Sequence, residues 1–233
     1  MTVRGDGGSD PAGKPGKIIA VGVNYADHAA ETGWAVTAAP NIFLKAPSAV
    51  IGDRQAIVLP AESVRVEHEA ELAVVIGRRL RRASVRQAWE GIAGYCCAND
   101  VTARDIQHAD GLPDYAKSFD TFCPLGPMTP ASRVDPGDLR IECLINGELR
   151  QSGRTSNMLT SIADLLVHIT AAMTLNPGDV VLTGTPAGAG PLIAGDVVSV
   201  RITGLGALTN HVVTERGSES SMKSAGPASC QSS

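Results

Sequence analysis

The sequence predicts an α+β fold, mostly β, in which a folded-over or barrel-like sheet carries a few short helices. Short β-rich segments dominate the chain, and only three segments show helical spacing. The 25 Gly and 14 Pro among 233 residues make up about 17% of the chain, against a typical ~12%, which favours many turns. Because 3 Phe, 3 Tyr and 2 Trp are the only aromatic residues, we expect an aliphatic core.

Local patterns place the elements along the chain. Strands are expected at residues 17–23, 64–76, 140–151, 180–183, 197–202 and 207–214, the third of them folded at Asn146-Gly147 into a hairpin. Helices are expected at 25–32, 84–94 and 161–175. The helix at 84–94 begins with a capping box of Ser84 and Gln87 and is expected to bury Val85, Trp89 and Ile92.

A single folded domain is expected at residues 17–216, because ~100–200 residues is the usual domain size. The Gly-rich residues 1–16 and the Ser-rich residues 217–233 are predicted to be flexible tails. The net charge of −4 excludes a strongly basic nucleic-acid binder. No apolar run reaches the ~18–20 residues that a membrane span needs, so we expect neither nucleic acid nor membrane as a partner.

The five cysteines predict a cytoplasmic protein. Their number is odd and no two have C-x-x-C spacing, so neither a disulfide framework nor a zinc site is indicated. Four of them lie in apolar stretches and are expected to pack as small hydrophobic side chains: Cys96, Cys97, Cys123 and Cys143.

Three glutamates occupy alternate positions of the expected strand at 64–76. Glu67, Glu69 and Glu71 therefore share one face, on which like charges repel unless a cation lies between them. Carboxylate oxygens are the ligands that Mg²⁺ and Mn²⁺ prefer. A solvated strand face explains the same spacing, and the three residues alone leave both interpretations open.

A second acidic position follows a short apolar strand expected at 96–98. Asp100 then lies at a strand end, beside an expected helix start. Arg104 and Gln107 are three residues apart and project from one face of that turn, where together they suit a substrate carboxylate. Alternatively, Asp100 caps a turn and Arg104 pairs with Asp105.

Four segments, in this order, resemble the signature of the fumarylacetoacetate hydrolase superfamily. They are residues 69–77 (EAELAVVIG), 99–107 (NDVTARDIQ), 117–127 (KSFDTFCPLGP) and 177–186 (PGDVVLTGTP). The resemblance extends from about residue 18 to residue 213. It implies a β-sandwich roll, usually a homodimer, in which residues 17–216 form the catalytic domain.

The resemblance also implies a ligand set and a substrate site. One Mg²⁺ or Mn²⁺ per subunit would be held by Glu69, Glu71 and Asp100, with Glu67 behind these ligands or exposed. Residues around the substrate would be Arg104, Gln107 and Thr183. Lys117 would be catalytic, as the cation nearest a developing enolate, unless it pairs with Asp120 instead.

Residues 22–31 (GVNYADHAAE) resemble the opening motif of the family, in which His and Glu form an acid–base pair on a short mobile helix. His28 and Glu31 share a helical face, so Glu31 can orient His28 as it takes a proton from water. Without the family context, His28 is interpreted as a surface histidine. Signals elsewhere are weaker: residues 45–49 and His108 are expected to border the pocket, His68 to point away from Glu69, and His168 to be structural.

The leading hypothesis is a metal-dependent hydrolase that cleaves a C–C bond in acylpyruvate-type 2,4-dioxo acids through a metal-stabilised pyruvate enolate. An isomerase of the 2-hydroxyhepta-2,4-diene-1,7-dioate type and an oxaloacetate decarboxylase use the same ligands in this family and stay open. A catalytically silent binding protein is the remote alternative. Because residues 108–116 are less typical of the family, the sequence leaves the 2-oxo acid substrate unspecified.

Overall fold

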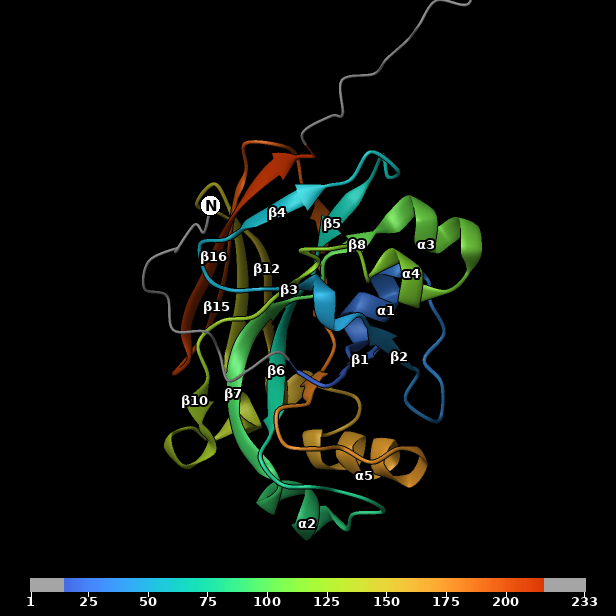
Figure 1. The fold of residues 1–233 in the computed structure, drawn as a ribbon, viewed down its shortest axis with the longest axis vertical. Helices are drawn as coiled ribbons and strands as arrows, with labels where there is room; N and C mark the ends of the chain where they lie inside the picture. The colour runs from blue at the N-terminus through green and yellow to red at the C-terminus, as the bar shows by residue number, and fades with distance from the viewer. Residues whose placement is uncertain (1–14, 216–233) are drawn as a thin grey trace, which may run out of the picture.

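Two large sheets form the body of the molecule in the computed structural model, which describes residues 15–215 (Figure 1). Except for residues 15 and 16, the tails predicted at 1–16 and 217–233 lie outside the described residues. Within residues 15–215, no helix is both long and apolar enough to cross a membrane.

The larger sheet has six strands in the order β10, β7, β6, β13, β1, β2. Their bounds are Ile18–Val21 (β1), Ile42–Lys45 (β2), Ala70–Ile76 (β6), Ile92–Asn99 (β7), Thr129–Pro130 (β10) and Val180–Leu182 (β13). β1 and β13 run parallel, and the other neighbours are antiparallel. β6 and β7 are buried on both faces, so they form the centre of the fold.

The second sheet has five strands in the order β12, β11, β15, β16, β4. Their bounds are Ala56–Leu59 (β4), Arg140–Ile145 (β11), Glu148–Arg154 (β12), Val197–Ile202 (β15) and Gly206–Thr214 (β16). The predicted hairpin joins β11 to β12, and both of its turn residues have positive φ, 53° at Asn146 and 85° at Gly147. β11, β15 and β16 pack against β6 and β7, which confirms a mostly-β α+β fold with two facing sheets.

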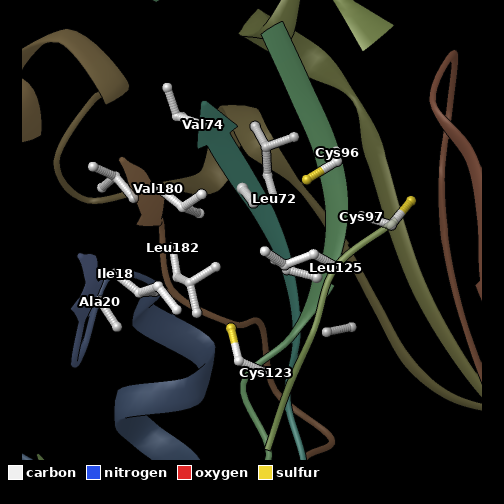
Figure 2. Close-up of a cluster of buried hydrophobic side chains, with 14 of the residues drawn as sticks. Ile18, Ala20, Leu72, Val74, Cys96, Cys97, Cys123, Leu125, Val180 and Leu182 are labelled. Atoms are coloured by element: carbon white, nitrogen blue, oxygen red, sulfur yellow. The ribbon is translucent and has the colours of Figure 1, made fainter. Parts of the chain in front are cut away.

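Aliphatic side chains and cysteines fill the core, as the composition predicts. Figure 2 shows side chains from β1, β6, β7 and β13 meeting in one cluster. Cys96 and Cys97 are neighbours on β7 and point to opposite faces, and the Cys97 thiol lies 3.7 Å from the carbonyl oxygen of Gly206. Burial raises the pKa of Cys97 to about 12, which keeps its thiol protonated and unreactive.

In the described part of the chain, residues 15–215, five helices cover two ends of the sheets. They are Ala26–Thr32 (α1), Val85–Glu90 (α2), Arg104–Asp110 (α3), Pro113–Ala116 (α4) and Ile162–Ala172 (α5). In Figure 1, α1, α3 and α4 gather on the side away from β15 and β16, whereas α2 packs against α5 at the other end of β6 and β7. Short 3₁₀ turns occur at Pro47–Ala49, Ala131–Arg133, Pro136–Asp138 and Thr155–Asn157.

The helix predicted at 84–94 is shorter than expected. The Ser84–Gln87 capping box is present, but α2 ends at Glu90, and Ile92 pairs with Ile76 as the first residue of β7. The predicted buried face is therefore wrong: Val85 and Trp89 are half-exposed, whereas Ala88 is fully buried. Pairing in the sheet stabilises Ile92 more than a further helical turn would.

The strand predicted at 64–76 is two strands that belong to different sheets. Val66–His68 (β5) pairs with Thr102–Ala103 (β8) and Gly190–Pro191 (β14), and the chain then crosses into β6 at Glu69. Side-chain amides replace the missing ladder partners: the Glu69 N–H donates to Asn99 Oδ1 and the Ala70 N–H to Gln151 Oε1, both at 2.9 Å. A further small sheet pairs Val50–Ile51 (β3) with Cys123–Pro124 (β9).

Gln151 is fully buried on β12, and its amide also donates to Thr185 Oγ1 and to the Pro186 carbonyl. We expect Gln151→Leu to lower the free energy of unfolding by about 2–4 kcal/mol, because each buried polar group left unpaired costs ~1–3 kcal/mol. Urea denaturation measures this change. Ser152→Ala, at an exposed position of the same strand, is the control, and an equal loss in both variants would contradict the assignment.

Candidate functional site

Three buried carboxylates meet where β6 begins and β7 ends. Glu69 and Glu71 flank the first residue of β6, and Asp100 follows the last residue of β7. The Asp100 N–H donates to the Glu69 carbonyl at 2.8 Å, which extends the pairing of the two strands by one residue. One oxygen from each of the three side chains lies within 4.8 Å of the others, so antiparallel pairing brings the predicted ligand set together.

Two lysines bind Asp100 from opposite sides. Lys117 donates from Nζ to Asp100 Oδ2 at 2.7 Å and to Glu69 Oε2 at 2.8 Å. Lys45, the last residue of β2, donates to Asp100 Oδ1 at 2.5 Å. Lys117 therefore pairs with the acidic cluster, and the alternative pair with Asp120 is absent from the ion pairs of residues 15–215.

Arg104 joins the glutamates of β5 and β6. Its guanidinium donates to Glu67 Oε2 at 2.7 Å, to Glu69 Oε1, and to Gln107 Oε1 at 2.5 Å. Glu67 is thus buried behind the cluster, and Arg104 does not pair with Asp105, which binds Ser63 and the Val64 N–H instead. Because its own protein partners occupy the guanidinium, a free carboxylate would have to displace one of them.

Of the four buried carboxylates at this site, Glu67, Glu69, Glu71 and Asp100, Glu71 is the one that the described residues leave without a cationic partner. It accepts one hydrogen bond, from the Gly184 N–H at 2.6 Å. Burial, followed by the charges of Asp100 and Glu69, raises the pKa of Glu71 well above its ordinary value. Burial also opposes ionisation of Glu69, but Lys117 and Arg104 outweigh it and hold the pKa of Glu69 below its ordinary value.

The cluster fits a divalent cation. Its oxygen-only donor set is the kind that Mg²⁺ and Mn²⁺ bind, and its oxygens are close enough together for one ion. A cation would also supply the positive charge that Glu71 lacks. Glu69, Glu71 and Asp100 are the residues that would hold it.

A cavity of about 500 Å³ opens onto this cluster. Glu69, Lys117 and Gln107 line it together with His28. Further wall residues come from the segments that follow β1 and α1, from β2 and the residue before it, and from α3 and α4, and include Trp34, Asn41, Phe43, His108 and Pro113. The same cavity is therefore lined by His28 as the candidate base, Glu69 as a candidate metal ligand and Lys117 as the candidate cation beside an enolate.

His28 and Glu31 lie on one face of α1, as their spacing predicts. The His28 ring is buried, and its Nδ1 lies 3.6 Å from Glu31 Oε2. Glu31 is held from the other side by the Gly188 N–H, at 2.9 and 3.1 Å from its two oxygens. His28 is thus a cavity residue, and its interpretation as a surface histidine is wrong.

Of the three predicted substrate residues, Gln107 lines the cavity, whereas Arg104 and Thr183 are not part of its wall. Thr183 is engaged by the backbone. Its hydroxyl donates to the Leu72 carbonyl at 2.9 Å, so it supports the turn whose next residue, Gly184, binds Glu71. Lys45 is the residue whose contact the sequence missed. The loop at 45–49 signalled a pocket border, but no local pattern indicates that a lysine at the end of β2 reaches Asp100.

The other histidines fall mostly as predicted. His68 is buried and binds Gln151 at 3.0 Å through Nδ1, on the opposite side of the chain from the carboxylate cluster. His108 lines the cavity, as expected from its place after Gln107. His168 is half-buried in α5 and takes no part in the site.

We expect Glu71→Gln to change how the stability of the metal-free protein depends on pH. Because the pKa of Glu71 is higher in the folded than in the unfolded state, this residue lowers the free energy of unfolding as pH rises above ~4.3, by at most ~1.4 kcal/mol per pH unit. The Glu71→Gln variant cannot ionise at this position, so its free energy of unfolding should not decrease in this way as the pH rises. Urea denaturation in EDTA between pH 5 and 8 measures the difference, and added Mn²⁺ should stabilise only the wild type.

Glu148→Gln, at an exposed position of β12, is the matched control and should behave as the wild type. Identical pH dependence of the Glu71→Gln variant and the wild type in EDTA would show that Glu71 does not hold a proton in the metal-free protein.

Comparison with known proteins agrees with this architecture. The family described as fumarylacetoacetate (FAA) hydrolase C-terminal matches residues 17–213. The structure of 5-carboxymethyl-2-hydroxymuconate delta-isomerase from Mycobacterium smegmatis is 48% identical, with a TM-score of 0.82 over 88% of this chain and 81% of that one. Fumarylpyruvate hydrolase from Pseudomonas aeruginosa, solved with Mn²⁺ and pyruvate, is 33% identical, with a TM-score of 0.82 over 86% of this chain and 91% of that one.

A curated relative from Bos taurus, oxaloacetate tautomerase FAHD2B, mitochondrial, is 43% identical over 87% of this chain and 68% of its own length. Isomerase, hydrolase and tautomerase thus occur among the similar proteins, and all three names denote enzymes. The family match covers nearly all of the described residues, and the fold and the acidic cluster agree with it. The chain belongs to the fumarylacetoacetate hydrolase family.

Proposed function

We propose that this chain is a divalent-metal-dependent hydrolase that cleaves the C–C bond of acylpyruvate-type 2,4-dioxo acids. The observation that carries the proposal is the common cavity of His28, Glu69 and Lys117. A base, a carboxylate ligand and a buried ammonium group then face the same substrate. Glu69, Glu71 and Asp100 would hold a Mg²⁺ or Mn²⁺ ion, which would supply Lewis-acid activation of the 2-oxo acid end of the substrate.

His28 acts on water in this proposal. It takes a proton as the water oxygen adds to the C4 carbonyl, and Glu31 stabilises the resulting imidazolium. The C3–C4 bond then breaks, and its electron pair passes to C3 to form the enolate of pyruvate, while C4 leaves as a carboxylic acid. His28 returns the proton to C3, so that one water and one dioxo acid become pyruvate and a second acid.

Lys117 supports the same step by charge. Its ammonium group is buried, and its contacts with Asp100 and Glu69 hold the pKa of Lys117 above its ordinary value despite burial, so it stays charged. A fixed, buried positive charge at the cavity wall stabilises the negative charge that develops on the 2-oxo oxygen. Gln107, which binds Arg104 and lines the cavity, would position the substrate carboxylate.

Isomerisation or tautomerisation of a 2-oxo acid is the second candidate. It is favoured by the similarity to proteins so named, which at 43–48% identity exceeds the 33% identity to the fumarylpyruvate hydrolase. These reactions move a proton on the enol of a 2-oxo acid without attack by water, so His28 would transfer that proton directly.

We also propose a homodimer in the cytoplasm, supported by the family resemblance and by the free thiols.

A discriminating assay offers the protein acetylpyruvate, fumarylpyruvate and oxaloacetate in turn, with Mn²⁺ or with EDTA. We expect Mn²⁺-dependent pyruvate release from the two acylpyruvates, followed with lactate dehydrogenase. Pyruvate from oxaloacetate alone would indicate decarboxylation. Faster enol–keto exchange of oxaloacetate, without pyruvate release from any substrate, would indicate a tautomerase and contradict the hydrolase.

Two substitutions separate the base from the ligands. His28→Ala should lower hydrolysis by about 10²–10⁴-fold, the usual contribution of a general base, while Mn²⁺ affinity measured by calorimetry stays the same. Glu69→Ala should abolish both Mn²⁺ binding and turnover. His211→Ala, an exposed position on β16, is the matched histidine control. Full hydrolytic activity in the His28→Ala variant would refute the role of this residue.

A further inference from the structure

Trp34 has a place in the cavity that neither the metal site nor the acid–base pair explains. It is one of two tryptophans in the chain and is half-buried, one residue after Gly33. Gly33 ends α1 with φ 72°, a left-handed conformation that turns the chain back toward the cavity. The indole thereby joins the cavity wall beside His28 and Glu69.

One neighbour of the indole is the guanidinium of Arg104. The central carbon of that group lies 5.6 Å from the centroid of the Trp34 ring, within the range of a cation–π contact. The same guanidinium donates to Glu67 and to Glu69. Trp34 therefore rests directly on the group that holds a candidate metal ligand in place.

The other neighbour is the imidazole of His28. The two ring centroids are 6.3 Å apart and the ring planes meet at 80°, an edge-to-face arrangement. His28 Nδ1 is buried and has no hydrogen-bond partner among residues 15–215, because Glu31 Oε2 at 3.6 Å is too far away. Since no hydrogen bond holds Nδ1, the Trp34 indole is the close neighbour that restricts the tilt of the His28 ring.

We propose that Trp34 is a positioning residue that docks α1 onto Arg104 and fixes the His28 ring over the cavity. This inference rests on the proposed function, in which His28 is the base. The contacts run from Glu69 through Arg104 and Trp34 to His28, so they link the carboxylate cluster to a base carried by a different element. Trp34 touches both groups with its ring alone, and a smaller aromatic ring should preserve part of each contact.

Kinetics of Trp34→Ala and Trp34→Phe test the proposal. Trp34→Ala should lower kcat by about 10–100-fold, the cost of misplacing a reacting group by ~1 Å, with KM changed by less than about threefold. Trp34→Phe should recover kcat to within about threefold of the wild type, because the ring edge and face are restored. Trp89→Phe, half-exposed on α2, is the matched control and should leave kcat and KM unchanged.

Two measurements read the position of His28 without turnover. The ring ¹H–¹³C resonances of His28, assigned by their loss in His28→Gln, should shift and broaden in Trp34→Ala and return in Trp34→Phe. Those of His211 should not move. Calorimetric titration with Mn²⁺ should give the same affinity in all variants, because Trp34 touches no carboxylate of the cluster directly.

These measurements distinguish a failure of the proposed hydrolase function from a failure of the positioning role of Trp34. If the wild type turns over no 2-oxo acid, the proposed function fails, and the His28 resonances still decide for or against Trp34. Unchanged kcat and unchanged His28 resonances in Trp34→Ala would overturn the positioning role. So would a parallel loss of thermal stability, Mn²⁺ affinity and kcat in both Trp34 variants, because that pattern indicates a purely structural residue.

Discussion

The structure depends on a buried cluster of like charges that must be neutralised away from water. Glu67, Glu69, Glu71 and Asp100 are all buried, and three buried basic side chains face them: Lys45, Arg104 and Lys117. Charges in a protein interior are stable only when they are paired, and Glu71 lacks such a partner among residues 15–215. Arg65 adds a further, more exposed partner to Glu67, so the cations gather on three of the carboxylates and leave Glu71 open to an added cation.

The two facing sheets serve this cluster by fixing the ends of β6 and β7. Both strands are buried on both faces, so their register cannot slip without exposing apolar residues. At Glu69 the chain leaves one sheet for another, and the amides of Asn99 and Gln151 satisfy the backbone groups that this change frees. The interruption lets Glu67 and Glu69 reach Arg104 while Glu71 turns toward Gly184.

The predicted pair of His28 and Glu31 is carried by a short helix, apart from the strands that hold the carboxylate cluster. α1 has only seven residues, and Glu31 reaches the Gly188 N–H from an exposed position. The proteins similar to this chain include a hydrolase, an isomerase and a tautomerase.

Local rules in the sequence accounted for much of the fold and for the identity of the acidic residues. The spacing of Glu67, Glu69 and Glu71 singled out the acidic residues, the Asn146-Gly147 turn set a hairpin, and a capping box began α2. These patterns depend on neighbours within a few residues, so the sequence encodes them directly. The prediction of a helix at 84–94 was wrong at its end for the same reason. Ile92 pairs with Ile76, which lies outside this segment, and a local pattern does not contain that partner.

Tertiary structure alone decided which cation meets which carboxylate. Lys45 reaches Asp100 across 55 residues of chain, Arg104 binds two glutamates instead of its neighbour Asp105, and the Thr183 hydroxyl turns to the Leu72 carbonyl. Trp34, on the loop after α1, likewise meets Arg104 of α3 from a distant part of the chain. Burial makes an ion pair strong and an unpaired charge costly, and burial is a property of the assembled sheets that periodicity along one segment does not carry.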